Sequence, residues 1–271
     1  MNKPKNAISM TVDLYQNRSL VRNFSKNDFK TKFAGSYLGI VWAFVQPVVT
    51  ILVYWFVFEI GLKAGRDCQY PFIVWLTAGL VPWFFFSEAW NSGTNALIEY
   101  SYLVKKVVFK INILPFVKVL SSLFVHLIFV CIAIVLSWGY GYTPDLYSLQ
   151  LLYYIFCSIV LTLGLSYLTS AVAVFFRDLK QIINILLQVG VWMTPIMWNL
   201  NDMIQSTAIV RIFKLNPVYY IVDGFRNALL DKIWFWEKPV WTLGFWAITL
   251  FVFWFGVKIF EKVRVYFADV L

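Results

Sequence analysis

The sequence is poor in charged residues, cysteine and histidine. Only 14% of its 271 residues are charged, whereas a typical soluble domain has about 25%. Three cysteines and one histidine are too few for a disulfide framework, a zinc cluster or a haem site. No glycine is followed directly by lysine, so the phosphate-binding loop of P-loop ATPases is absent. These shortages exclude a disulfide-stabilised scaffold and an ATPase of the P-loop kind.

Apolar and aromatic side chains make up most of the sequence instead. The chain is 61% hydrophobic and 20% aromatic, which is more apolar surface than a water-soluble fold of this size can hide. Intrinsic disorder is excluded for the same reason. The composition predicts an all-α integral membrane protein. Its net charge of +9 then indicates basic membrane loops rather than a nucleic-acid partner.

Six segments are free of Asp, Glu, Lys and Arg over about the 20 residues that cross a bilayer as a helix. They are Phe33–Phe58, Cys68–Ser87, Val119–Pro144, Leu146–Phe176, Gln181–Asn201 and Pro239–Val257. Two shorter apolar pieces, Met203–Val210 and Leu215–Val222, cannot cross. We predict six transmembrane helices, with a re-entrant external hairpin before the last span.

The positions of Lys and Arg predict the orientation of the chain. Sixteen of them precede the first span, follow the last or lie in the second-to-third and fourth-to-fifth connections, against seven on the opposite side. Both termini of this multi-pass membrane protein are therefore expected in the cytoplasm. The expected organisation is a cytoplasmic N-terminal segment over 1–33, a six-span membrane domain over 34–260 and a cytoplasmic tail over 261–271.

Basic residues recur every four positions before the first span. They are Arg18, Arg22, Lys26 and Lys30. One basic stripe opposite apolar residues predicts an amphipathic helix lying in the membrane interface, near anionic headgroups. The alternative is a solvated basic arm that only sets topology. Ser25 and Asp28 fit a capping box, which predicts that a second helical segment begins there.

The second cytoplasmic loop contains apolar residues at helical spacing. They are Leu97, Ile98, Tyr102 and Leu103, and Lys105 and Lys106 follow at the negative end of the helix. A short amphipathic helix in such a loop needs something to cover its apolar side. Periodicity alone leaves lipid and a cytoplasmic partner protein equally open.

Ionisable residues are scarce in the spans, while aromatic residues are abundant. The last three spans have no Asp, Glu, Lys, Arg or His, and the single His126 reads as a core histidine of the third span; ion-coupled transport lacks its usual residues. The aromatic residues form either an interfacial belt or a channel wall that stacks on sugar rings. The candidate wall residues are Trp42, Trp83, Phe84, Phe85, Phe86, Trp90 and Trp192.

Four stretches together resemble one family. Segments 33–47, 95–115, 176–195 and 215–229 resemble, in this order, the first span, second cytoplasmic loop, fourth-to-fifth turn and last external segment of ABC-type polysaccharide and polyol-phosphate export permeases. The resemblance implies two copies of this chain with two separate ATP-binding subunits, which carry ATP and Mg, while this chain holds no cofactor and is no enzyme. The implied substrate is an undecaprenyl-diphosphate-linked glycan, and the implied location is the bacterial plasma membrane.

The resemblance also implies roles for particular residues. The coupling helix that docks on the ATP-binding subunit would comprise Asn95, Leu97, Ile98, Glu99, Tyr102, Leu103, Lys105 and Lys106. Leu38 and Gly39 would join the interfacial helix to the first span, and residues 203–232 would line or cap the exit. Because a diphosphate needs cationic partners, Lys30, Lys32 and Arg177 are candidates for the place where it enters, unless these cations serve topology alone.

Two other functions compete with glycan export. A related permease could export a drug or small lipid, which predicts Met- and Leu-rich patches instead of an aromatic wall. A membrane enzyme acting on polyprenyl-phosphate needs an acid pair or a histidine at the interface, which the sequence does not offer. Among glycans, wall teichoic acid is slightly favoured over O-antigen and capsule, since no further sugar-reading domain is apparent.

Overall fold

The charge-poor segments form α-helices in the computed structural model, which describes residues 16–63, 69–106 and 110–271. The helices that follow the expected spans are α3 (Trp42–Trp55), α4 (Phe72–Glu99), α6 (Ile113–Gly139), α7 (Gln150–Phe175), α8 (Leu179–Met193) and α12 (Pro239–Val263). Shorter helices are α2 (Arg18–Lys32), α5 (Ser101–Val104), α9 (Leu200–Met203), α10 (Thr207–Lys214), α11 (Pro217–Arg226) and α13 (Phe267–Val270). No strand occurs among these residues, so the all-α prediction is confirmed.

Among the residues that the structure describes, five helical segments are long and apolar enough to cross a membrane. They are Gly39–Gly61, Phe72–Glu99, Ile113–Gly139, Leu146–Phe175 and Pro239–Val270. The fifth expected span, 181–201, is only partly helical: α8 has 15 residues and ends at Met193. Thr194 precedes Pro195, and this pair disfavours further helix because proline lacks an N–H and restricts the residue before it. The predicted end of that span is therefore wrong.

The second and third spans also differ from their predicted bounds. The second was expected at 68–87, with Cys68 outside the described residues, but α4 continues to Glu99. The third was expected from Val119, but α6 begins at Ile113 and contains Lys118. In both cases a charged residue, Glu88 or Lys118, interrupts the apolar run in the sequence. In the fold each of these charges forms an ion pair with a residue of α2, so the helix continues through it.

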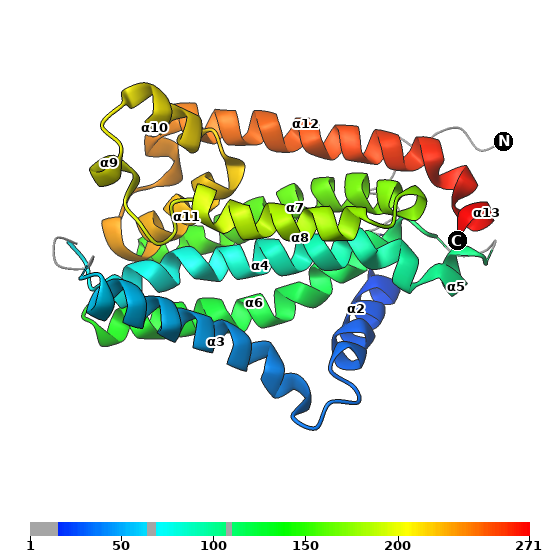
Figure 1. Ribbon diagram of the computed structural model, residues 1–271, viewed down its shortest axis with the longest axis horizontal. Helices are drawn as coiled ribbons and strands as arrows, with labels where there is room; N and C mark the ends of the chain where they lie inside the picture. The colour runs from blue at the N-terminus through cyan, green and yellow to red at the C-terminus, as the bar shows by residue number, and fades with distance from the viewer. Residues whose placement is uncertain (1–15, 64–68, 107–109) are drawn as a thin grey trace.

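The long helices lie side by side in one bundle (Figure 1). At one end, here the α2 end, lie α2, α5 and α13; at the other, the α10 end, lie α9, α10 and α11 (Figure 1). Helices α7 and α12 approach closely, because a Cβ on Gly256 would stand 2.3 Å from the carbonyl oxygen of Gly164. The basic connections that the sequence grouped together, before α3, after α4, after α7 and after α12, all lie at the α2 end.

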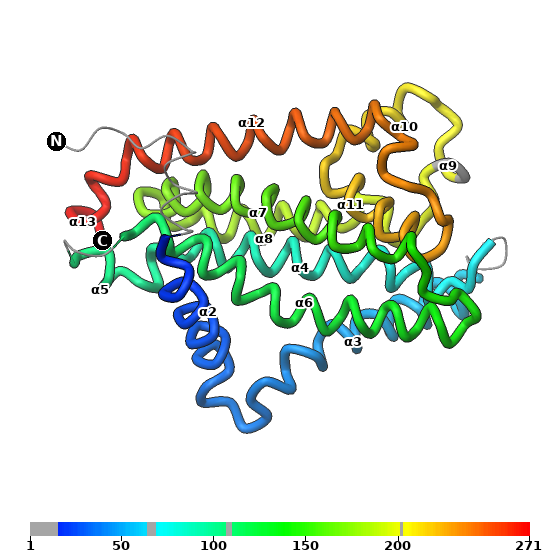
Figure 2. The backbone as a smooth tube through the Cα atoms, turned by 180° about the vertical axis from the view of Figure 1, so that it is seen from behind, coloured from blue at the N-terminus to red at the C-terminus, as the bar shows by residue number. Residues whose placement is uncertain are grey.

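Helices α2 and α3 form the two arms of a V whose apex, the turn between them, points away from the bundle (Figure 2). The turn between them has positive φ at Gly35 (90°) and Gly39 (52°), a conformation that glycine adopts without steric cost. On α2, Val21 packs on Ile113 and Val117 of α6. Helix α2 is unbroken through Ser25, so the helix start predicted there is wrong. Along α3 only Ile51 is buried, while Phe44, Tyr54 and Trp55 are partly buried against the bundle and the remaining apolar face points outward.

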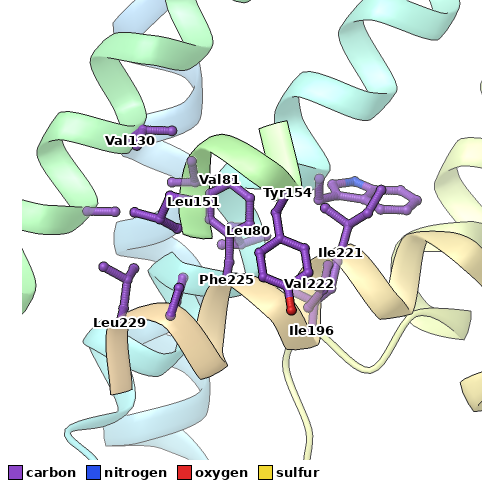
Figure 3. Close-up of a cluster of buried hydrophobic side chains, with 14 of the residues drawn as sticks. Leu80, Val81, Val130, Leu151, Tyr154, Ile196, Ile221, Val222, Phe225 and Leu229 are labelled. Carbon is purple, nitrogen blue, oxygen red and sulfur yellow. The ribbon is translucent and has the colours of Figure 1, made fainter. Parts of the chain in front are cut away.

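The expected hairpin corresponds to α10 and α11. Helix α10 has no buried residue, whereas α11 inserts into the bundle (Figure 3), where Ile221, Val222 and Phe225 lie beside Tyr154 of α7. Asn216 begins α11 by accepting a hydrogen bond from the Val218 N–H at 2.9 Å, and Pro217 occupies the first helical position. The short helix is therefore a core element of the α10 end.

Arg226 stabilises the non-helical segment that follows α8. Its guanidinium is buried, donates to the carbonyls of Pro195 at 3.0 Å and Ile196 at 2.7 Å, and lies 3.5 Å from the centroid of the Trp75 ring. Backbone carbonyls released by the end of a helix are costly to bury without donors. Arg226 supplies these donors, so the chain can end α8 inside the bundle.

Candidate functional site

Charged side chains from three helices meet at the α2 end. The Lys118 ammonium of α6 lies 2.6 Å from a carboxylate oxygen of Asp28 on α2 and 2.6 Å from one of Glu99 at the end of α4. The Tyr100 hydroxyl donates a hydrogen bond to Asp28, and Lys118 also lies 4.8 Å from the Tyr100 ring centroid. We call Asp28, Glu99, Tyr100 and Lys118 the charge cluster.

Two members of the charge cluster, Lys118 and Asp28, are withdrawn from solvent. The side chains of Lys118 and Asp28 are 10% and 4% exposed, so each depends on the other for compensation of its charge. Burial raises the pKa of the Tyr100 hydroxyl, and the hydrogen bond to Asp28 raises it further. Tyr100 therefore stays a donor at neutral pH. The cluster ties α2 to the junction of α4 and α5.

A second ion pair lies one turn further along α2. Lys32 pairs with Glu88 of α4, and the Ser92 hydroxyl donates to the same carboxylate at 2.7 Å. Both side chains are about two-fifths exposed, so the pair is accessible to a ligand. A cavity of about 260 Å³ separates it from the charge cluster, lined among others by Asp28, Lys32, Glu99 and Lys118.

A larger cavity opens between the arms of the V. It has a volume of about 280 Å³, and we call it the α2 cavity. Helices α2, α3, α4 and α6 contribute to its lining, which includes Lys32, Glu88, Ser121, Ser122, His126, Phe29, Phe33, Trp42, Gln46, Phe84, Phe85 and Phe129. Lys32 and Glu88 give it a charged part and the aromatic residues an apolar part, so its lining matches an amphiphile.

His126 is a buried polar residue in the wall of this cavity. It is 3% exposed, its ring stacks on Phe85 with centroids 4.7 Å apart, and neither ring nitrogen has a hydrogen-bond partner within the described part of the chain. The sequence predicted a core histidine, and the structure places it in the core but at the cavity wall.

Only one of the three cations suggested for a diphosphate lies in the α2 cavity. Lys32 lines it. Lys30 is exposed on α2, and Arg177 is exposed beyond the end of α7; neither belongs to the lining residues. The structure therefore does not bring the three together.

The seven aromatic residues suggested as a channel wall divide into three groups. Trp42, Phe84 and Phe85 share the lining of the α2 cavity with Lys32. Trp83, Phe86 and Trp90 pack on one another, with ring centroids 5.7 and 5.5 Å apart, and the first two are buried. Trp192 on α8 is about half exposed and contacts the Phe58 ring at 6.5 Å.

The loop helix expected around residues 95–106 is divided between two elements. Asn95 to Glu99 form the last turn of α4, and α5 follows after a break at Tyr100. Asn95 and Leu97 are buried, and Leu97 belongs to a cluster with Ala171 and Phe260, so the chain itself covers part of the apolar side. Ile98 and Leu103 are half-buried, whereas Glu99, Tyr102, Lys105 and Lys106 are exposed.

The basic stripe lies on the outer face of α2. Arg18, Arg22, Lys26 and Lys30 are all exposed, while Val21, Ser25 and Asp28 are buried against the bundle. The helix is therefore amphipathic, but its apolar face packs on α6. The predicted joint coincides with the turn at Leu38 and Gly39, where a 3₁₀ turn (Gly39–Val41) leads into α3.

Sequence patterns did not identify the charge cluster. Asp28 and Lys118 are 90 residues apart, and the sequence pattern marked Asp28 only as a capping residue. The available signal was Lys118 itself, because a charge beside an apolar run needs a partner in the folded bundle. Within residues 16–63, 69–106 and 110–271, no group of three His, Cys, Asp or Glu side chains is placed to hold a metal ion.

Comparison with known proteins yields consistent matches. The family model for the ABC-2 type transporter matches residues 20–230. The O-antigen export system permease protein RfbA of Myxococcus xanthus is 27% identical over 97% of this chain and 99% of its own length. The protein of the same name from Klebsiella pneumoniae is 26% identical over 98% and 100%. The polysialic acid transport protein KpsM of Escherichia coli is 23% identical over 75% and 78%.

Proposed function

Since the chain belongs to the ABC-2 type transporter family, we propose that it is the membrane-spanning permease of an ATP-driven exporter of cell-surface polysaccharide. The observation that carries this proposal is the match with O-antigen export permeases over nearly their whole length and nearly the whole of this chain. A match of this extent covers the spans, the loops between them and the α10–α11 hairpin together.

The names of the relatives, which are O-antigen export and polysialic acid transport, favour a polysaccharide over the wall teichoic acid that the sequence slightly preferred. They give no support to export of a drug or small lipid. We propose that the polysaccharide travels on an undecaprenyl-diphosphate carrier. An amphiphile of this kind suits the α2 cavity, where Lys32 could pair with phosphate and the aromatic residues could contact a hydrocarbon chain.

We propose that two copies of the chain form the passage between them. The interior of the bundle is filled by side chains such as Leu80, Val81 and Phe225 (Figure 3), so a glycan does not fit through one copy. Helices α3 and α8 present apolar faces outward, which suits a symmetric contact around a passage. Trp42 and Trp192, each about half exposed, are then wall residues, whereas Trp83 and Phe86 act as core residues.

Energy for transport is proposed to come from a separate ATP-binding subunit that carries ATP and Mg. The α2 end offers a surface for it, because Tyr102, Lys105 and Lys106 are exposed beside the end of α4. This assignment places the α2 end, and with it the C-terminal helix α13, on the cytoplasmic side of the bacterial inner membrane. The charge cluster would then transmit motion of the docked segment to α2.

Copurification tests the proposal. The tagged chain, expressed with the ATP-binding subunit of its exporter, should retain that subunit in detergent, and ATP hydrolysis should respond to lipid-linked glycan. Depletion of the chain should cause lipid-linked glycan to accumulate inside the cell. An ATP-binding subunit that never associates, together with unchanged glycan levels, would refute the proposal.

A matched pair of variants tests the docking surface. Tyr102→Ala should weaken retention of the ATP-binding subunit, because the 57% exposed ring is available for burial at the α2 end. Tyr140→Ala removes a ring that is 51% exposed at the α10 end, so it should leave retention unchanged. Equal retention by the two variants contradicts the proposed docking surface.

A further inference from the structure

A second kind of cavity lies at the α10 end, away from the α2 cavity. It has a volume of about 180 Å³ and is enclosed by the end of α10, by α11 and by the segment that leads into α12. We call it the α10 cavity. It is lined by Tyr154, Lys214, Tyr219, Tyr220, Asp223, Asn227, Trp234, Phe235, Lys238 and Trp241.

Polar side chains form one part of the α10 cavity. The Lys238 ammonium lies 3.2 Å from a carboxylate oxygen of Asp223 and 3.3 Å from the amide oxygen of Asn227. The Asn227 amide donates to the same Asp223 oxygen at 3.2 Å. The three side chains hold one another in place and combine donors and acceptors, which is what a ligand with several hydroxyl groups needs.

Aromatic rings form the remainder. Trp234, Trp241 and Tyr219 come from three different segments and line the same space. Trp234 is held in position by Trp236, whose ring stacks on it with centroids 4.4 Å apart and an angle of 10°. The ammonium of Lys214 lies 5.9 Å from the Trp241 ring centroid. Flat apolar faces are therefore presented next to the polar group.

We propose that the α10 cavity is a sugar-binding site, which holds one ring of the glycan as it leaves the permease. A sugar ring has an apolar C–H face that stacks on aromatic rings and a rim of hydroxyls that exchange hydrogen bonds with amide, carboxylate and ammonium groups. Cavities of about 300–1,000 Å³ enclose drug-sized ligands, so the smaller α10 cavity suits one ring rather than a folded oligosaccharide.

The charge of the lining favours a sugar over a bare phosphate. Asp223 compensates Lys238, and the Lys214 ammonium faces a ring, so no two cations converge on one point. The proposal rests on the proposed function, because it needs the α10 end to lie where the glycan leaves. It adds a site that recognises the glycan itself, distinct from the α2 cavity that we propose for the phosphate of the lipid carrier.

Binding is measured on the permease purified with its ATP-binding subunit. Saturation-transfer-difference NMR is recorded with the methyl glycosides of glucose, galactose, N-acetylglucosamine and rhamnose, and with inorganic phosphate as a competitor. We expect saturation of at least one glycoside, a loss of about threefold to tenfold in affinity in Trp241→Ala, and substantial recovery in Trp241→Phe. Trp254→Ala removes an exposed ring further along α12 and should match the wild type.

Three results would overturn the sugar site. They are no saturation of any of the four glycosides, equal saturation in Trp241→Ala and the wild type, and displacement of the glycoside by phosphate. Thermal unfolding of the two alanine variants, compared in parallel, separates a lost binding face from a damaged fold.

Export in cells gives an independent readout. Surface glycan should fall about threefold to tenfold in Trp241→Ala, by the same reasoning, while the ATP-binding subunit still copurifies; Trp254→Ala should export normally. Normal export by Trp241→Ala overturns the inference and leaves the proposed function intact. Failure of the proposed function would instead appear as loss of the ATP-binding subunit from the wild-type chain.

Discussion

Lys118 and Asp28 form a buried ion pair of 2.6 Å between α6 and α2. The Lys32–Glu88 ion pair, the packing of Val21 on α6 and the ring contacts of Phe24 and Phe29 also hold this N-terminal helix on the bundle. The Lys118 ammonium also contacts the last residue of α4. A displacement of the α4–α5 junction would therefore act on Asp28 of α2 through the Lys118 side chain.

Asp28→Asn should lower the stability of the chain. Removal of one partner of a buried ion pair costs about 3–5 kcal/mol, and since Lys118 keeps Glu99 we expect about 2 kcal/mol. The free energy of unfolding can be measured by titration with a denaturing detergent. Asp28→Leu combined with Lys118→Met should recover most of the loss, since no buried charge is then left unpaired and Glu99, which loses Lys118, is half exposed to solvent. A value for Asp28→Asn equal to that of the exposed control Lys30→Gln contradicts the ion pair.

Gly256→Ala should force α7 and α12 apart. The new Cβ would stand 2.3 Å from the Gly164 carbonyl oxygen, which is backbone and cannot rotate away. Overpacking of this kind costs about 1–3 kcal/mol, and we expect the upper part of that range. Gly244→Ala on the same helix meets nothing within 4 Å and should be neutral or stabilising by about 0.5–1 kcal/mol. Thermal unfolding of both variants checks the difference; similar melting temperatures would refute the close packing.

Arg226→Lys should destabilise the α10 end although it preserves the charge. A lysine has no planar fork that reaches the carbonyls of Pro195 and Ile196 together while it lies flat on Trp75. Hydrogen bonds from charged groups contribute about 1.5–3 kcal/mol each, so the loss should exceed 1.5 kcal/mol. Hydrogen exchange of residues 194–200 should increase selectively. Arg211→Lys, which changes an exposed residue of α10, serves as the control, and equal exchange in both variants would contradict the role of Arg226.

Lys32→Gln should reduce export more than Lys30→Gln. Both residues lie on α2, but only Lys32 lines the α2 cavity, so only its loss removes a cation available to a phosphate. We expect a raised KM for lipid-linked glycan in transport assays with vesicles. Lys32→Gln also leaves Glu88 without its ion pair; the double change with Glu88→Gln should show the same raised KM. A KM restored by the double change would assign the effect to the ion pair instead.

The sequence predicted the helical class, the hairpin and the grouping of basic loops well, because these depend on hydropathy and on charge along the chain. It misjudged α4 because Glu88 interrupts the apolar run, and the partner that allows the helix to continue, Lys32, lies 56 residues earlier. Because α4 was expected to end before Glu88, Leu97 was assigned to a separate amphipathic helix in the second cytoplasmic loop. Its neighbours Ala171 and Phe260 come from α7 and α12, contacts that no local pattern reveals.

The end of α8 could have been predicted from the sequence, because Pro195 disfavours helix at this position. The sequence did not reveal which donors bind the buried carbonyls after the end of α8. Arg226, which supplies them, lies 31 residues after Pro195 and was counted only among the loop cations. Neither the α2 cavity nor the α10 cavity could be predicted from the sequence, for a similar reason. Each is assembled from three or more segments, and its chemistry exists only where those segments meet.

The shortness of α8 has a consequence for the bilayer itself. Fifteen residues of helix extend over about 22 Å, whereas the hydrocarbon layer is about 30 Å thick. A helix this short is matched by local thinning of the membrane where lipid touches it, or by association with another copy where a second chain touches it. A lipid carrier that turned its headgroup over beside a thinned stretch would travel a shorter apolar distance than beside the 27 residues of α6.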